Sequence, residues 1–443
     1  MKKVLFVTYF WPPSGKASLH WPLFIIKHLP KFGWQPLVLT VKEDTFSGKD
    51  ESLLKEVAPE LTVKKTDSFE PFTLYKKFTG KKKDEQLVAS ETISRSNRSL
   101  THRVSIWIRM NLFIPDARAG WYFPGVRGGS DIFRDERIDA IVSIGPPHTS
   151  LIIGMRLSKK FNVPHIPVFI DPWVDIVYYK NFKRSKPTLA IDNYLEKKVL
   201  SNCKAAVFVT NTMKEDYNRK YEFLKSKSHV LYWGYNEENF CLPPNPPDQS
   251  GQALPKEGGM NADYKNSSNK ILEVLVHAGN IFDFQNTPQF WERVKKEIDC
   301  GRNLKIKFIG TVSPGIKQTI NDSGLTPFTE YLGFLPYNKM LEELSRASYL
   351  LVCATEPRHV PGKLFEYLRI GKPVIAFGND NNEVKKILED ASAGMMFRYD
   401  ENGEEFFLNA KNFKTYLEKI KKYDRESIAR SLTSILDSSI NNS

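Results

Sequence analysis

The sequence predicts an α/β protein built from two doubly wound parallel sheets. Short apolar runs alternate with helix-length amphipathic segments along most of the chain. Runs such as VLFVTYF, AAVFVT, ILEVLVHAG and LLVCA are apolar throughout, as expected for strands covered by helices on both faces. At 443 residues the chain is also too long for one ordinary core, so more than one domain is expected.

The apolar runs fall into two sets separated by a stretch rich in Pro, Gly, Asn and Ser, which is typical of a linker. We therefore expect a Rossmann-like domain over 1–241, a linker over 242–270 and a second Rossmann-like domain over 271–425. The first set predicts strands at 4–10, 36–41, 62–65, 139–145, 165–170, 205–210 and 230–233. The second set predicts strands at 271–277, 305–310, 331–335, 349–354, 373–377 and 394–398.

The composition narrows the classes of partner. A formal net charge of +13 favours nucleotides, phospholipid head groups or nucleic acid, but no nucleic-acid recognition module accompanies it. The four cysteines are scattered and suggest reduced thiols in a cytoplasmic protein. The opening MKKVLFVTYFWPP predicts a buried strand rather than a signal peptide, and no apolar stretch is long enough to predict a membrane span.

One segment, 68–129, interrupts the alternation of strands and helices. Aromatic residues and lysines are interleaved in it, and the candidate amphipathic helix RSLTHRVSIWIRMNLF follows. One interpretation is a surface excursion whose aromatic side chains pack on the domain. The other is an interfacial patch for a lipid-linked acceptor or an anionic membrane leaflet. The sequence leaves both open.

Ligands of open parallel sheets bind beyond the carboxyl ends of the strands, and polar residues follow three strands of the first half. Gly15 and Lys16 precede a helix expected near Ala17, where free N–H groups favour an anion. His148 follows the strand at 139–145 and Asp171 follows the strand at 165–170. These residues are candidates for binding hydroxyls or moving protons, although an ordinary turn or helix caps would explain them too.

The second half has a more specific pattern. Gly279 and Asn280 end its first strand, and PGKLFEYL follows the strand at 349–354. Gly362 permits close approach of a ligand, Lys363 can reach an anion at a helix start, and Glu366 lies on the same helix face. The alternative is a surface ion pair between Lys363 and Glu366, which their position after a sheet strand disfavours.

No paired Asp-x-Asp and no His/Cys cluster predicts a divalent-metal site, so no metal or other cofactor is expected. The charge of an anionic ligand would then be balanced by helix dipoles, backbone N–H groups and basic side chains.

In combination, these motifs resemble the family-4 glycosyltransferases of the GT-B fold, bacterial enzymes with two facing Rossmann domains. The resemblance extends over nearly the whole chain. It rests on FVTYFWPPSG, FIPDARAGW, SIGPPHTS, DPW, LYWGYNEENF, GNIFDFQN and, most specifically, PGKLFEYLRIGKPVIAFG.

The resemblance implies a metal-independent, retaining transferase that moves a hexosyl or N-acetylhexosaminyl group from a nucleoside-diphosphate donor to a lipid-linked or polysaccharide acceptor. It implies that Glu366 holds the donor ribose, that Gly362 and Lys363 lie near the diphosphate, and that a terminal helix at about 426–443 crosses back onto the first domain. We assign catalytic roles to His148, Asp171 and Lys363, and donor binding to Gly15, Gly279, Asn280, Gly362, Lys363 and Glu366.

The chain departs from the family pattern at Lys16, at Ile170 before DPW, and at Arg358, where many members carry a second acidic residue. Two alternatives therefore stay open: a nucleotide-sugar epimerase of the same fold, and a catalytically impaired nucleotide-sugar-binding protein. We expect a cytoplasmic protein that associates peripherally with the inner face of a membrane and does not bind nucleic acid.

Overall fold

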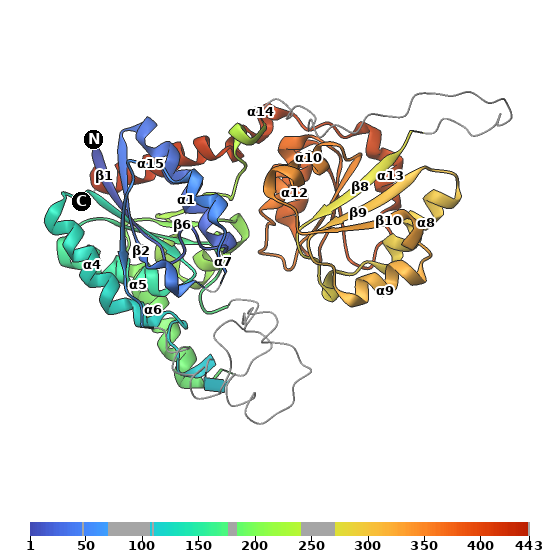
Figure 1. Cartoon of the computed structure of the whole chain (residues 1–443). Helices are drawn as coiled ribbons and strands as arrows, with labels where there is room; N and C mark the ends of the chain where they lie inside the picture. The colour runs from blue at the N-terminus through green and yellow to red at the C-terminus, as the bar shows by residue number, and fades with distance from the viewer. Residues whose placement is uncertain (47, 70–106, 109, 176–183, 241–270, 442–443) are drawn as a thin grey trace. The chain divides into compact units, whose positions relative to one another are not determined.

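The computed structural model describes residues 1–46, 48–69, 107–108, 110–175, 184–240 and 271–441 (Figure 1). The chain forms two compact units: unit 1 comprises Met1–Trp233 with Arg425–Ser443, and unit 2 comprises Gly234–Asp424. The predicted linker, 242–270, lies outside the described residues. Unit 2 begins before residue 242 because the Tyr235 N–H donates to the Tyr423 carbonyl at 3.0 Å and Arg369 forms an ion pair with Glu237.

Seven parallel strands form the sheet of unit 1. They are β1 (Lys2–Val7), β2 (Trp34–Val41), β3 (Thr62–Thr66), β4 (Ala140–Gly145), β5 (His165–Phe169), β6 (Ala206–Phe208) and β7 (Ser228–Val230). Their order is β3-β2-β1-β4-β5-β6-β7, so the chain crosses over next to β1. This doubly wound arrangement confirms the predicted fold class for the first half.

Helices cover both faces of this sheet (Figure 1). They are α1 (His20–His28), α4 (Tyr122–Asp135), α5 (Thr149–Phe161), α6 (Lys186–Asn202), α7 (Asn211–Lys220) and α15 (Arg425–Asn441). Along β1, Val4 and Phe6 enter one apolar cluster while Leu5 and Val7 enter another on the opposite face. A strand buried on both faces must be apolar at successive positions, which explains the run VLFV.

The terminal helix α15 belongs to unit 1, where it packs on α1 (Figure 1). The Arg425 guanidinium lies 4.3 Å from the centroid of the Phe24 ring, and Ile428, Leu432 and Leu436 are buried in the core. A spacing of four residues places these three side chains on one face of the helix.

Unit 2 contains six parallel strands in the order β10-β9-β8-β11-β12-β13. The strands are β8 (Glu273–Ala278), β9 (Leu304–Ile309), β10 (Thr329–Gly333), β11 (Tyr349–Cys353), β12 (Val374–Phe377) and β13 (Gly394–Phe397). The helices are α8 (Pro288–Asp299), α9 (Pro314–Asp322), α10 (Tyr337–Ser345), α11 (Lys363–Ile370), α12 (Asn382–Ala391), α13 (Glu404–Asn409) and α14 (Leu417–Ile420). This second parallel α/β unit also matches the prediction.

Each predicted strand has a counterpart, with small shifts at the ends. The strand expected at 230–233 occurs earlier in the chain, as β7. The last hydrogen bond to the neighbouring strand runs from the Leu231 N–H to the Phe208 carbonyl, at 3.0 Å, and the chain leaves the sheet at that point. The helix expected near Ala17 begins with a 3₁₀ turn, Ala17–Leu19, before α1. Most of the predicted excursion, 70–106, lies outside the described residues, and no helix within the described ranges is long and apolar enough to cross a membrane.

Candidate functional site

The candidate site of unit 2 is centred on Lys363, the first residue of α11. Its amino nitrogen lies 3.4 Å from Nε2 of His277, near the end of β8. A Cβ atom added to Gly279 would lie only 2.8 Å from the same nitrogen. The cation therefore reaches from the start of α11 to the carboxyl end of β8, and a larger residue at position 279 would displace it.

The protonation states of His277 and Lys363 determine the charge of this part of the site. Nδ1 of His277 lies 3.0 Å from the Leu351 carbonyl, which places the imidazole proton on Nδ1 and leaves Nε2 to accept from Lys363. Burial, and secondarily the charge of Lys363, holds the pKa of His277 well below its usual value. Burial also lowers the pKa of Lys363 to about 8, against the opposing effects of Cys353 and Glu366. At neutral pH the site thus combines an ammonium with a neutral imidazole.

The loop after β8 is held close to the sheet. Gly279 has φ +101° and Gly310 has φ +105°, and a Cβ on Gly310 would come within 2.8 Å of the Gly279 carbonyl. Two side chains fix the loop further: the Tyr367 hydroxyl accepts the Ala278 N–H at 2.9 Å, and the Gln285 amide donates to the Cys353 carbonyl at 3.1 Å. Only glycine tolerates this backbone at low cost.

Asn280 follows Gly279 and is exposed. Its Oδ1 accepts the N–H of Thr311 at 3.2 Å, which ties the loop after β8 to the loop after β9. The predicted pair of Gly279 and Asn280 therefore lies at the carboxyl edge of the sheet, with Asn280 also serving a structural contact.

Glu366 lies one helical turn after Lys363 and accepts a hydrogen bond from the Tyr337 hydroxyl at 2.6 Å. The Tyr337 oxygen in turn accepts from the Asn239 amide at 3.3 Å. The two charges of the predicted pair are thus directed to different partners, Lys363 toward His277 and Glu366 toward Tyr337. Sequence analysis missed Tyr337, although its position at the start of α10, shortly after β10 ends, was a usable signal.

Arg358, where the chain departs from the family pattern that it resembles, lies shortly before α11. It pairs with Glu356 at 3.1 Å, and the Asn381 amide donates to the Glu356 carbonyl at 2.8 Å and the His359 carbonyl at 2.7 Å. This network fixes the segment that leads into α11. The charge of Arg358 is balanced within the segment by Glu356.

In unit 1, His148 lies at the N-terminal end of α5 and is buried. Its ring stacks on Trp173 with centroids 4.8 Å apart, and it hydrogen-bonds the backbone of Asp171. Within the described residues Nε2 has no partner. Burial lowers the pKa of His148 to about 3, so this ring is a neutral acceptor at physiological pH rather than a carrier of positive charge.

Buried acids on α6 support the loop that contains Asp171 and Trp173. Asp192 accepts from the indole N–H of Trp173 at 3.2 Å. Glu196 accepts from the Tyr217 hydroxyl at 2.8 Å, and that hydroxyl accepts the Trp173 N–H at 2.9 Å. Sequence analysis missed both acids, whose spacing of four residues places them on one face of the helix.

The FIPDARAGW segment supplies a cap for α5. Asp116 accepts from the backbone N–H and the hydroxyl of Thr149, both at 2.9 Å. Burial raises the pKa of Asp116, in opposition to these hydrogen bonds. This carboxylate therefore satisfies the first N–H of α5, whereas Nε2 of His148, the residue before the helix, has no partner within the described residues.

Gly15 is exposed in the loop after β1. Its N–H donates to the Gly48 carbonyl at 3.0 Å, and Ser14 forms an antiparallel bridge with Lys49. A Cβ on Gly15 would meet the Gly48 backbone at an ordinary 3.6 Å. The structure thus places Gly15 at the predicted edge of the sheet but directs its N–H to the protein.

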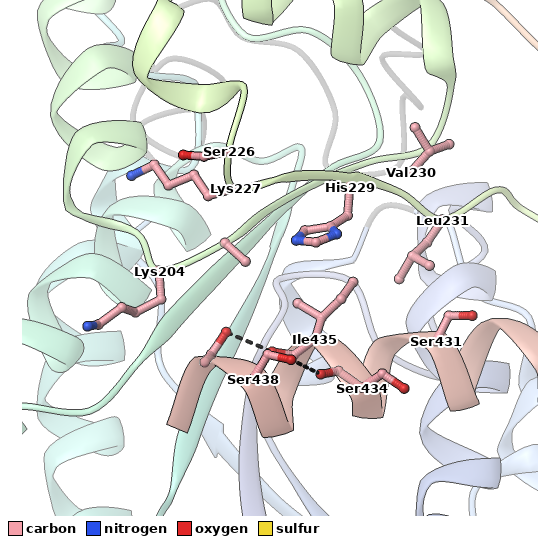
Figure 2. A pocket seen from close by; sticks show the side chains of 12 residues that line it. Lys204, Ser226, Lys227, His229, Val230, Leu231, Ser431, Ser434, Ile435 and Ser438 are labelled. Atoms are coloured by element: carbon pink, nitrogen blue, oxygen red, sulfur yellow. Dashed lines mark hydrogen bonds between the residues drawn. The ribbon is translucent and has the colours of Figure 1, made fainter. Parts of the chain in front are cut away.

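Two further observations concern other kinds of site. Within the described ranges, no group of three or more His, Cys, Asp and Glu side chains is arranged to hold a metal ion. A pocket of about 550 Å³ lies between α15 and the residues around β7, where His229 lies above Ser434 and Ile435 (Figure 2). It contains none of the predicted site residues, and the Lys227 ammonium at its edge already donates to the Leu200 and Cys203 carbonyls, each at 2.8 Å.

Comparison with protein families finds one similarity, and it lies within unit 2. Residues 273–412 match the family model described as Glycosyl transferases group 1. Unit 2 is thus similar to the group 1 glycosyl transferases. The matched range contains the residues of unit 2 that the sequence singled out: Gly279, Asn280, Gly362, Lys363 and Glu366.

Solved structures extend the similarity to the whole chain at the level of fold. A glycosyltransferase from Rickettsia africae is 13% identical with a TM-score of 0.61, covering 100% of this chain and 99% of that one. The Anabaena protein HepE, solved with UDP and glucose, is 13% identical with a TM-score of 0.57, covering 99% and 100%. A UDP-N-acetylglucosamine 2-epimerase is 11% identical with a TM-score of 0.52, covering 97% and 94%.

These similarities confirm the GT-B fold predicted from the sequence. No curated protein matches the chain by sequence.

Proposed function

We propose that this protein is a retaining glycosyltransferase that moves a hexosyl or N-acetylhexosaminyl group from a nucleoside-diphosphate sugar to a lipid-linked or polysaccharide acceptor. In the reaction, the bond between the anomeric carbon and the diphosphate oxygen breaks and a bond to an acceptor oxygen forms, while the acceptor hydroxyl loses its proton. The observation that carries the proposal is that Lys363 and Glu366 both lie on the first turn of α11, within the range that matches the family model.

The proposed donor site uses the cluster at the carboxyl edge of the unit 2 sheet. The Lys363 ammonium, Gly362 at the N-cap of α11 and the close backbone at Gly279 suit a diphosphate, because a helix start and a fixed cation both stabilise negative charge. Glu366 would accept ribose hydroxyls beside Tyr337. We assign Asn280 to the donor as well, and we propose that transfer needs no metal because the Lys363 ammonium and the start of α11 can balance the leaving diphosphate.

On unit 1, we propose that His148 accepts a hydrogen bond from a sugar hydroxyl through Nε2. Its neutral state and its open acceptor position support this role. Asp171 lies where its backbone orients the His148 ring, and its carboxylate would serve the same sugar. We assign both to catalysis together with Lys363.

The experiment that tests the proposal is an assay of the purified full chain with a panel of nucleotide sugars, in the presence and absence of candidate glycan acceptors. We expect nucleoside diphosphate release that depends on acceptor, and a product whose anomeric configuration, measured by NMR, matches that of the donor. Nucleotide binding without release under every pairing would leave a binding protein, and inversion would contradict the retaining mechanism.

A nucleotide-sugar epimerase is the second candidate, and the fold similarity to a UDP-N-acetylglucosamine 2-epimerase favours it over other classes. An epimerase converts its substrate without an acceptor. Incubation with UDP-N-acetylglucosamine alone, followed by proton NMR, separates the two functions: appearance of the C2 epimer supports this candidate, and its absence together with acceptor-dependent release supports the transferase.

A further inference from the structure

A second functional surface lies on unit 1, where α4 and α5 lie side by side (Figure 1). Glycines bring the two helices close together. A Cβ on Gly125 would lie 2.6 Å from Cδ1 of Ile153, and one on Gly129 would lie 2.4 Å from Cδ1 of Leu157. The spacing of four residues on each helix aligns these contacts, so the outer faces of α4 and α5 form one surface with fixed geometry.

The two helices line a groove of about 690 Å³. Its charged residues are strongly unbalanced, because four cations face one carboxylate. They are Arg127, Arg134, Arg156, Lys160 and Asp131. A groove lined largely by one sign of charge concentrates ligands of the opposite sign.

Internal contacts satisfy only part of this positive charge. Arg134 pairs with Asp131, and the Lys160 ammonium donates to the Ser130 hydroxyl at 2.9 Å. Arg127 and Arg156 are exposed, and neither has an ion pair or side-chain hydrogen bond within the described part of the chain. Two guanidinium groups from different helices are thus available for phosphate oxygens, which they bind in a bidentate manner.

Aromatic side chains border the same groove. Phe123 is 80% exposed at the N-terminal end of α4, and its ring lies 5.1 Å from that of Tyr122. Exposed aromatic rings next to unpaired basic groups are typical of surfaces that lie in the interface of a bilayer.

We propose that the α4–α5 face, defined by Phe123, Arg127, Arg134, Arg156 and Lys160, docks this protein on a membrane that contains anionic lipid. The guanidinium groups bind lipid phosphates, and Phe123 enters the head-group region. A small soluble anion would use the cations but would gain nothing from the exposed ring, which is why the combination favours a lipid surface. The inference concerns a site separate from the donor cluster and holds whichever reaction that cluster catalyses.

The test measures co-sedimentation of the full chain with vesicles of phosphatidylcholine alone or of an equal mixture with phosphatidylglycerol. We expect binding to the anionic vesicles only. The triple variant Arg127→Gln, Arg156→Gln, Lys160→Gln should bind about a hundredfold more weakly, from about fivefold per charge removed. The matched control is Lys411→Gln, Lys414→Gln, Lys421→Gln, which removes the same charge from exposed lysines of unit 2 and should bind within about twofold of the unmodified protein.

Phe123→Ser tests the aromatic part of the face. Its binding to anionic vesicles should fall about tenfold, because the apolar ring no longer leaves water, whereas Leu408→Ser, also at a highly exposed position, should bind normally. Thermal melts should show that all variants remain folded, since every altered side chain is exposed.

Equal losses in the two triple variants would overturn the proposal, because binding would then follow net charge alone. Equal binding of the unmodified protein to neutral and anionic vesicles, or absence of binding to both, would overturn it too. Stronger release by inorganic phosphate than by chloride at the same ionic strength would reassign the groove to a small anion.

Discussion

The amino nitrogen of Lys363 and Nε2 of His277 lie 3.4 Å apart, and they join the start of α11 to the end of β8. Because His277 keeps its proton on Nδ1, the Lys363 ammonium donates to a neutral ring and keeps its full charge for a ligand. Burial lowers the pKa of Lys363 to about 8, so the charge of the proposed diphosphate site changes within an accessible pH range.

The pH dependence of nucleotide binding follows from this pKa. The protonated form of Lys363 attracts the diphosphate, so affinity should be highest near pH 7 and fall toward tenfold per pH unit above about pH 8. Isothermal titration with UDP across this range measures it. Lys363→Arg should bind with little change over the same interval, because a guanidinium does not titrate there. A falling affinity in the Arg variant would assign the titration to another group.

The hydrogen bond between Tyr337 and Glu366 predicts that substitutions at the two positions weaken nucleotide binding to different extents. Glu366→Gln should weaken nucleotide binding about tenfold to a hundredfold, because charge-assisted bonds contribute roughly 1.5–3 kcal/mol. Tyr337→Phe removes one bond to the carboxylate and should cost a few-fold. Tyr331→Phe is the control, since Tyr331 is equally exposed but has no hydrogen bond to Glu366 in the described structure. Equal effects of the two tyrosine variants would contradict a specific role for Tyr337.

Substitution of Gly279 tests whether nucleotide binding depends on the absence of a side chain next to the Lys363 amino nitrogen. Gly279→Ala should lower both stability and nucleotide affinity, because the new Cβ would lie 2.8 Å from the Lys363 amino nitrogen and φ is +101°. Gly333→Ala also has positive φ, +63°, but its Cβ would meet no atom within 4 Å. We expect Gly333→Ala to lower the free energy of unfolding by about 1 kcal/mol and Gly279→Ala to lower it by more, with a loss of UDP affinity only at position 279.

His148 is tested by a variant that keeps an aromatic ring. His148→Phe retains a surface for stacking on Trp173 but removes the acceptor at Nε2. We expect the transfer rate to fall about tenfold to a hundredfold while UDP affinity in unit 2 stays unchanged. With a pKa near 3, His148 should cause no inflection in the rate between about pH 5 and pH 8. An inflection near pH 6.5 that disappears in the variant would show that the ring titrates there.

Chelation tests the proposed handling of the leaving group. Because Lys363 and the N-terminal end of α11 can balance the diphosphate charge, acceptor-dependent release should persist after dialysis against EDTA. Complete loss of release that returns with Mg²⁺ or Mn²⁺ would replace this mechanism by a metal-assisted one.

Much of the fold could be predicted because its signal is local. Strands buried on both faces need consecutive apolar residues, so β1, β8 and β11 are visible as runs in the sequence. The parallel topology places the residues that follow the strands at one edge of each sheet, where His148 lies after β4, Gly279 after β8 and Lys363 after β11. The strand β7 was predicted too late in the chain, because pairing begins at the polar residues Ser228 and His229 and the apolar run begins only at Val230.

The contacts that give the site its chemistry could not be predicted, because they join residues far apart in the chain. The Tyr337 hydroxyl donates to Glu366, the Trp173 indole donates to Asp192, and the first N–H of α5 donates to Asp116. No local sequence pattern links the two residues of any of these pairs. The sequence by itself determined which residues lie at the carboxyl edges of the sheets. Only the tertiary structure decided their protonation and their partners, because the pKa values of Lys363 and His148 depend on burial by segments that folding brings together.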